Sequence, residues 1–369
     1  MRKGWEYKKL NEVCEKGASN IVINKLTDNS GEYPLFGASG LVKNIDFFHQ
    51  DKPYIGIVKD GAGVGRVNIY PAYSSLVGTM QYIFPKEGYS IDFIKYFLVK
   101  LDLSHCVSGA TIPHIYFKDY GKENIPTPSL DTQLAIVSEL DKINELIRLK
   151  KEQLKDFDNL AQSLFYEMFG DPVENEKGWE VKKLGEVCTD VTDGDHMPPP
   201  KSEFGIPFIT ISDIDKDTRC LNFENTFYVP EDYYNNLKEN RKPQKGDLLY
   251  TVTGSYGIPV IVKTDKKFCF QRHIALLRPN QEILSTIFLC YWVLSDGVRF
   301  MADKVATGIA QKTVGLNSIR KFSCILPPLS LQRLFAQRIE QIEREKSEVQ
   351  KSIQDLETLL ASRMQYWFE

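Results

Sequence analysis

The sequence predicts an α+β protein in which two globular, β-rich domains are joined by two long antiparallel helices that form a coiled coil. First, the stretch KGWEYKKLNEVC at residues 3–14 returns as KGWEVKKLGEVC at residues 177–188, with ten of twelve positions identical. Second, each copy continues with short apolar runs that glycine and proline interrupt, a pattern typical of strands and turns. Third, each copy closes with a long stretch that has heptad spacing. We therefore expect an internal pseudo-twofold repeat.

The two copies agree at their edges and differ in their middles. The opening stretches lie 174 residues apart, whereas SGATIPHI at 108–115 and TGIAQKTV at 307–314 lie 199 residues apart. The second copy therefore carries 25 extra residues between these edges. The expected parts are a first domain, a central helix, a second domain and a C-terminal helix, at residues 1–128, 129–170, 171–327 and 328–369.

The two closing stretches each predict a helix of about 40 residues, or roughly 60 Å. Apolar residues recur there in steps of four and three, at nine of ten seam positions in the first stretch and eight of ten in the second. An ordinary core helix is the alternative, but a helix of this length cannot bury its seam in a small core. We expect the two seams to pair, through Ile143, Ile147, Lys150, Leu154, Phe157, Lys346, Val349, Ile353, Leu356 and Leu360.

A pseudo-twofold relation places equivalent helices antiparallel, so we pair seam residues whose numbers sum to about 503. Leu154 then faces Val349, and Lys346 faces Phe157. Each lysine of the seam is expected to pack its stem against an apolar partner while its ammonium reaches water. Because the sequence stops at QYWFE after the second helix, the N-terminal segment is expected to complete the repeat.

The composition excludes several classes of protein. A length of 369 residues suggests about two domains. No apolar run reaches the roughly 18 residues that a membrane helix needs. Seven scattered cysteines without a Cys-x-x-Cys pair indicate reduced thiols. We therefore expect a cytoplasmic protein without a membrane partner.

Motifs for catalysis are missing from the sequence. The stretch KDGAGVGRV at 59–67 has Arg66 where a dinucleotide fingerprint needs its last glycine, and no Gly-Lys-Ser or Gly-Lys-Thr occurs. A tight turn between two strands explains this stretch better. The chain has no Asn-Pro-Pro-Tyr stretch of an amino-methyltransferase, and its histidines have no metal-ligand spacing. We expect no catalytic residue, cofactor or metal in this chain.

Local charge points to nucleic acid, although the net charge is only −3. Residues 238–278 carry nine basic and three acidic side chains, enough for a surface that follows phosphates, with an ordinary solvated surface as the alternative. Base reading needs polar side chains that reach the groove edges from rigid elements. The candidates are Lys43, Lys59, Arg66, Thr111 and His114 in the first copy, and Arg241, Lys245, Ser255, Tyr256, Gln271, Arg272, His273, Gln311 and Lys312 in the second.

This arrangement resembles the specificity (S) subunits of Type I restriction–modification systems over essentially the whole chain. The resemblance rests on the repeated KGWExKKLxEVC stretch, the glycine-led loops GATIPHI and GIAQKTV, and the PSLDTQLAIV and PPLSLQRLFA junctions into the long helices. EYPLFGASGLVKN at 32–44 and GIPFITISDI at 205–214 resemble starts of target-recognition domains in that family. Each motif alone is weak, but their doubled order is specific.

The resemblance implies a division of labour. Each domain would be a target-recognition domain that reads one half of a bipartite, asymmetric sequence in double-stranded DNA, and the helices would set the unread spacer. Two modification subunits would bring S-adenosylmethionine and methylate adenine. Restriction subunits would bring ATP and Mg for translocation and cleavage. This chain would be the non-enzymatic recognition subunit.

Two other interpretations stay open at this point. The chain could serve a methylation-only system, or a related enzyme in which nuclease and methylase are fused. It could instead be a coiled-coil scaffold with β-rich protein-binding modules and no role on DNA.

Overall fold

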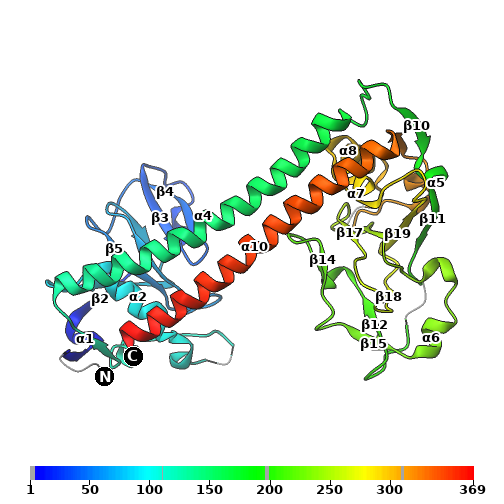
Figure 1. Cartoon of the computed structure of the whole chain (residues 1–369). Helices are drawn as coiled ribbons and strands as arrows, with labels where there is room; N and C mark the ends of the chain where they lie inside the picture. Colours follow the sequence, from blue (N-terminus) through cyan, green and yellow to red (C-terminus); the bar gives the residue numbers. More distant parts are fainter. Residues whose placement is uncertain (1–4, 110, 196–198, 309–310) are drawn as a thin grey trace. The chain divides into compact units, whose positions relative to one another are not determined.

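The computed structural model describes residues 5–109, 111–195, 199–308 and 311–369 (Figure 1). The chain divides into two compact units. The first contains the described residues up to Glu152 together with Gln350–Glu369, and the second is Gln153–Val349. Each unit thus contains part of both long helices, α4 (Leu130–Phe169) and α10 (Leu329–Phe368).

The first unit is built on a four-stranded antiparallel sheet with the order β2–β8–β5–β6. These strands are Cys14–Ala18, Met80–Pro85, Tyr54–Val58 and Val67–Tyr70. A three-stranded sheet, β4–β3–β7, comprises Gly40–Ile45, Tyr33–Gly37 and Ser75–Leu76, and β1 (Tyr7–Lys9) pairs with β9 (Asn124–Pro126). The shorter helices are α1 (Leu10–Val13), η1 (Ile23–Leu26), α2 (Ile91–Leu101), η2 (Leu103–Cys106) and α3 (Phe117–Tyr120).

The second unit repeats this topology. Its four-stranded sheet has the order β11–β19–β16–β17, formed by Cys188–Asp193, Ile274–Pro279, Leu248–Thr251 and Pro259–Ile261. Its three-stranded sheet, β15–β12–β18, comprises Phe227–Val229, Ile206–Ile209 and Cys269–Phe270, and β10 (Glu180–Lys183) pairs with β20 (Ser323–Leu326). The shorter helices of the second unit include α5 (Leu184–Val187), α7 (Thr286–Leu294), α8 (Asp296–Val305) and α9 (Leu316–Ile319).

The expected internal repeat is confirmed, and most of the 25 extra residues have a definite place. Phe36 and Val58 are 22 positions apart in the first unit, whereas their counterparts Ile209 and Thr251 are 42 apart. The added segment contains the hairpin β13–β14 (Ile214–Asp215 and Cys220–Leu221) and the helices η3 (Ile211–Asp213), α6 (Glu231–Asn235) and η4 (Glu239–Arg241). The second copy therefore elaborates a shared framework.

The central strands are the apolar runs that the sequence shows. All five residues of β5 and all four of β16 are buried, since each strand has neighbours on both edges and packed faces. A continuous apolar run of this length fits a strand buried on both faces. In each unit, the C-terminal end of one long helix also packs into the hydrophobic core. Phe368 lies 5.1 Å from Phe93 of α2, measured between ring centroids, and Phe169 lies 4.8 Å from Phe288 of α7.

Within each unit the two long helices run antiparallel, as expected. In the first unit Glu139 accepts hydrogen bonds from Arg363, and Lys151 lies 2.8 Å from Glu357. In the second unit Phe165 packs against Phe335. All ten predicted seam residues are buried or half-buried, which is the burial that a paired seam requires.

One seam expectation is corrected by the structure. The Lys346 ammonium does not simply reach water: it lies 2.8 Å from Asp158 Oδ1 and 3.5 Å from Glu343 Oε1. Asp158 directly follows the apolar partner that we assigned, Phe157. The lysine stem therefore lies in the seam while its charge is compensated by carboxylates at the edge.

The N-terminal segment packs on the end of α10. The rings of Trp5 and Trp367 stack at 6.0 Å, and Lys100 forms an ion pair with Glu369 at 2.6 Å.

Among the described residues, no helix has both the length and the hydrophobicity needed to cross a membrane.

Protonation of Glu139 is expected to weaken this end of the first unit. The hydrogen bond from Arg363, with help from Trp367, lowers the pKa of Glu139 below 4.5. A carboxyl whose pKa is lower in the folded state stabilises the fold above its unfolded pKa, and this contribution disappears as the pH falls through the folded pKa. Below about pH 4.5 the unfolding free energy of the native chain should therefore fall more steeply than that of Glu139→Gln. Urea unfolding at a series of pH values measures this, and parallel profiles would contradict it.

Candidate nucleic-acid interface

The same pair of loops is docked together in both units. In the first unit the loop after β5 meets the Ser108–His114 loop, where Gly61 N donates to Pro113 O at 2.9 Å and Ile115 N to Lys59 O at 2.9 Å. In the second unit the loop after β16 meets the Thr307–Thr313 loop, through Gly254 N to Lys312 O at 2.9 Å. Ala110, Ile309 and Ala310 lie outside the described residues. The two loops form one surface at the end of each four-stranded sheet.

Glycine is required at the start of each docked loop. Gly109 has φ +94° and Gly308 has φ +109°, in the region that L side chains rarely adopt. A Cβ atom at Gly109 would lie 2.4 Å from Ile112 O, and one at Gly308 would lie 2.3 Å from Gln311 O. The glycine-led motifs of the sequence therefore have a steric cause.

In the first unit, the structure brings Lys59, Arg66, Thr111 and His114 to this surface. His114 Nδ1 lies 2.8 Å from Asp60 Oδ1, and Lys59 Nζ lies 3.7 Å from Asp60 Oδ2. Thr111 and Arg66 are exposed. Asp60 thus joins the two loops, a role that the sequence did not reveal.

Lys43 lies elsewhere in the first unit, on β4 of the three-stranded sheet. Its ammonium donates to the Leu26 carbonyl at 2.8 Å. Part of its hydrogen-bonding capacity is therefore used within the protein.

In the second unit, Gln271, Arg272 and His273 form the turn between β18 and β19. Val252 N donates to His273 O at 2.9 Å, which places this turn beside the loop after β16. Gln271 Nε2 lies 3.2 Å from His273 Nδ1. Burial, and then the Arg272 guanidinium, lower the pKa of His273, so its imidazole is neutral at neutral pH and offers one donor and one acceptor.

The other candidates of the second unit differ in their freedom to bind. Gln311 and Lys312 are exposed on the Thr307–Thr313 loop. Ser255 Oγ accepts from Lys216 Nζ at 3.1 Å, and the Tyr256 hydroxyl donates to Asp303 at 2.6 Å. Both hydroxyls are therefore held in place within the unit.

Arg241 reaches the same end of the sheet, but carboxylates surround it. Its guanidinium lies 3.4 Å from Asp193 and 3.7 Å from Asp195. Lys245 precedes β16, whereas the loop of the surface follows this strand, so Lys245 lies at the opposite end. The structure does not bring Lys245 into the cluster.

The basic run at 238–278 is partly compensated by acids, which pair with Arg241, Lys242, Lys245 and Arg278. Arg278 donates to both Asp247 oxygens, at 2.9 and 2.8 Å, and Lys242 Nζ lies 2.6 Å from Glu239. The Asp247 side chain is only 3% exposed, so this pair belongs to the protein interior. The sum of charges along this run therefore overstates the cationic surface that it presents.

Within the described residues, no three His, Cys, Asp or Glu side chains are arranged to hold a metal ion. Sequence analysis did not single out Asp60, Lys216 or Asp303. They hydrogen-bond to the candidates His114, Ser255 and Tyr256, which are 39 to 54 positions away along the chain. No local pattern marks such partners, because strand register decides them.

Comparison with known proteins relates both copies of this chain to one family. Residues 2–156 and again 176–358 match the family model described as Type I restriction modification DNA specificity domain. The chain is similar to the Type I restriction enzyme MjaIX specificity subunit of Methanocaldococcus jannaschii, with 21% identity over 97% of this chain and 91% of that protein. It is also similar to the MjaVIII specificity subunit of the same organism, with 23% identity over 82% of this chain and 76% of that protein.

Two solved structures have a fold similar to that of this chain. The S subunit of a Type I restriction–modification system from M. genitalium aligns with a TM-score of 0.55 and 13% identity, covering 99% of this chain and 96% of that one. A second solved chain comes from work on the complex assembly and conformational transition of the type I R-M system. It aligns with a TM-score of 0.62 and 19% identity, covering 99% of this chain and 97% of that one.

Proposed function

Because the chain belongs to the Type I restriction–modification DNA specificity family, we propose that it reads a bipartite, asymmetric DNA target, with one half-site for each unit. The main support is the docked loop pair, which has the same backbone arrangement in both units but carries different side chains. Asp60 and His114 meet in the first unit, where Thr253 and Thr313 meet in the second. A shared framework with different polar groups is what two different half-sites need.

The chemistry of the surface suits base edges in the major groove. Arginine pairs well with the O6 and N7 atoms of guanine, and glutamine with the N6 and N7 atoms of adenine. Arg272, Gln311 and Lys312 are exposed on loops at a sheet end. A carboxylate such as Asp60 could accept from the cytosine amino group.

We further propose that the chain is a non-catalytic subunit that assembles with two DNA-methyltransferase subunits and with restriction subunits. S-adenosylmethionine, ATP and Mg would be held by these partners in the cytoplasm. The proposal is supported by the missing catalytic motifs and by relatives that are named specificity subunits.

Methylation by a reconstituted complex tests the proposal. The chain, combined with the methyltransferase subunits of its own organism, should methylate a random DNA library at one two-part motif with a fixed unread spacer. The chain alone should transfer no methyl group. Methylation without sequence preference, or transfer by the chain alone, would contradict it.

Arg272→Ala tests the contact type at the second unit. If Arg272 pairs with a guanine, its loss should weaken binding by about 1–3 kcal/mol and relax the preference at one base position. Competition binding against duplexes that vary at each position measures this, with Lys245→Ala as a control from the other end of β16. A uniform loss over all sequences would make Arg272 a phosphate contact.

A further inference from the structure

The second unit contains a cavity of about 570 Å³ that the DNA-reading surface does not use. It lies among the β13–β14 hairpin, β17, α7 and α10, and its size is typical of small-molecule sites. The wall has an apolar part and a charged part. The apolar residues are Pro259, Ile261, Ile287 and Ile339, and the charged residues are Arg219, Lys263, Glu340, Glu343 and Arg344.

The hydroxyl of Tyr291, a residue that lines this cavity, has no protein hydrogen-bond partner among the described residues. Tyr291 is only 5% exposed. Burial raises the pKa of Tyr291, so the phenol keeps its proton and remains a donor. A ligand acceptor inside the cavity would therefore find a hydrogen-bond donor in this hydroxyl.

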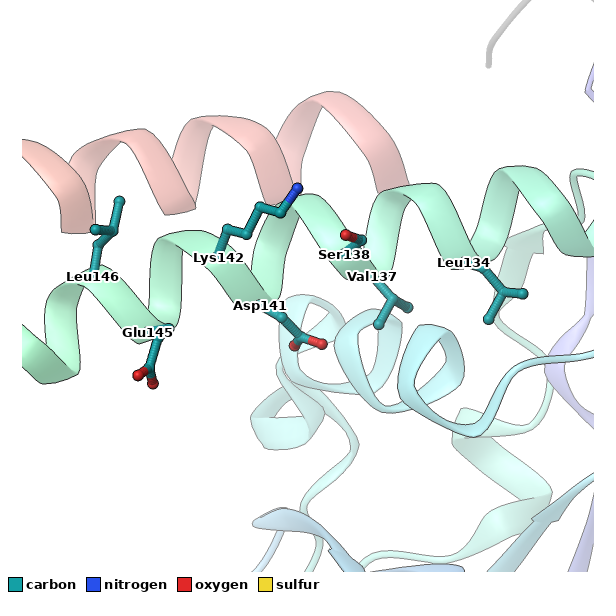
Figure 2. Close-up of a pocket in the computed structure, with 7 residues that line it drawn as sticks. All are labelled: Leu134, Val137, Ser138, Asp141, Lys142, Glu145 and Leu146. Atoms are coloured by element: carbon teal, nitrogen blue, oxygen red, sulfur yellow. The ribbon is translucent and has the colours of Figure 1, made fainter.

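The first unit shows how the equivalent tyrosine hydroxyl finds its hydrogen-bond partners within the protein. Tyr96 is the sixth residue of α2, as Tyr291 is of α7. The Tyr96 hydroxyl donates to Asp141 at 2.5 Å and accepts from Asn144 at 2.9 Å. Figure 2 shows Asp141 turned from α4 toward the helices of the globular part.

The second unit has other residues at these two positions. The positions of α10 that correspond to Asp141 and Asn144 of α4 are Glu340 and Glu343, the twelfth and fifteenth residues of each helix. Neither glutamate bonds to Tyr291, and both line the cavity instead. The tyrosine hydroxyl is therefore hydrogen-bonded to the long helix in the first unit but not in the second.

Arg219 supplies a cation that only the second unit possesses. The hairpin turn is held by Asp215, which accepts from Asp217 N at 2.9 Å and Thr218 N at 2.8 Å. Arg219 Nη2 donates to Asp158 at 3.0 Å, but Asp158 also accepts from Lys346 at 2.8 Å. Among the described residues, the other guanidinium nitrogens have no partner, so Arg219 can still bind an anion.

We propose that this cavity binds a small amphipathic anion, with an apolar body against the isoleucines and one carboxylate, phosphate or sulfonate at Arg219 and Tyr291. Both groups donate hydrogen bonds, and an anionic acceptor satisfies both at once. The three cations of the wall outnumber its two carboxylates. Among the described residues, the first unit has no counterpart of the β13–β14 hairpin, so we expect one such site in each chain.

Two dyes that differ only in the presence of a sulfonate group test the proposal on the full chain. 8-Anilinonaphthalene-1-sulfonate should bind at one site, about tenfold tighter than its uncharged analogue N-phenyl-1-naphthylamine, because a hydrogen bond to a charged group is worth about this factor. Arg219→Met should abolish the difference. Tyr291→Phe should weaken sulfonate binding several-fold, whereas Tyr96→Phe and Arg333→Met, matched controls outside the cavity, should leave it unchanged.

A blocking variant separates the cavity from other apolar surfaces. Ser347 lines the cavity and is exposed on α10, so Ser347→Tyr should obstruct the cavity without disturbing the core. Fluorescence titration should then show the sulfonate site lost while the circular dichroism spectrum stays native. Equal affinity for the two dyes, or full sulfonate binding by Ser347→Tyr or Arg219→Met, would overturn the proposal. DNA is absent from these titrations, so they do not depend on the half-site assignment.

Discussion

Replacement of residues 20–115 by the matching segment of a relative is expected to exchange one half-site completely and to leave the other unchanged. This segment begins after β2 and contains both docked loops of the first unit, which present Lys59, Arg66 and His114. The framework strand pair β1–β9 and both long helices remain native. Because the second unit keeps its own loops, its half-site should not respond.

The structure refines where the exchange must end. The sequence alone suggests residues 20–107, because the copies diverge over this span. That boundary separates the loop after β5 from the Ser108–His114 loop to which it is bonded. We expect the 20–107 chimera to keep part of the original preference through Thr111 and His114, and the 20–115 chimera to switch cleanly.

Methylation of a random library by each reconstituted chimera measures the outcome. The reciprocal exchange in the second unit is the control, since it should alter only the other half-site. If either exchange altered both half-sites together, recognition would not be divided between the two units.

A four-residue insertion in α4 after Leu154 is expected to lengthen the preferred spacer without altering either half-site. α4 is a single helix of 40 residues that continues from the first unit into the second. Four residues add about 6 Å, nearly two base-pair rises, and rotate the following turn by about 40°. If the long helices set the spacer, half-sites at the native separation should be methylated poorly.

A matched design keeps the helix seam intact. Seven residues inserted after Leu154 and seven after Val349 add about 10 Å to each helix while preserving the heptad phase. This double insertion should lengthen the spacer by about three base pairs with little loss of stability. Four residues inserted at Gly88, in the turn between β8 and α2, are the control, and a spacer that is unchanged in all three variants would show that the helices do not measure it.

Much of the fold could be predicted because it depends on periodic or repeated features. The repeated opening stretch predicts two copies, the steps of four and three predict two long helices, and the short apolar runs that form β5 and β16 predict strands. Gly109 and Gly308 mark the docked loops because no side chain fits there. Each of these signals lies within a short stretch of chain, so the sequence alone determined it.

The tertiary structure decided which charged side chains are paired within the protein and which remain free to contact DNA. It pairs Asp60 with His114 and Asp158 with Lys346, and it turns Arg278 inward to Asp247. It also places Lys245 at the wrong end of β16 for the proposed surface. Strand register and helix packing bring together residues that lie 31 to 188 positions apart, and no local pattern encodes such a meeting. For the same physical reason, only the folded chain distinguishes Tyr96, which has its partners, from Tyr291, which lines a cavity.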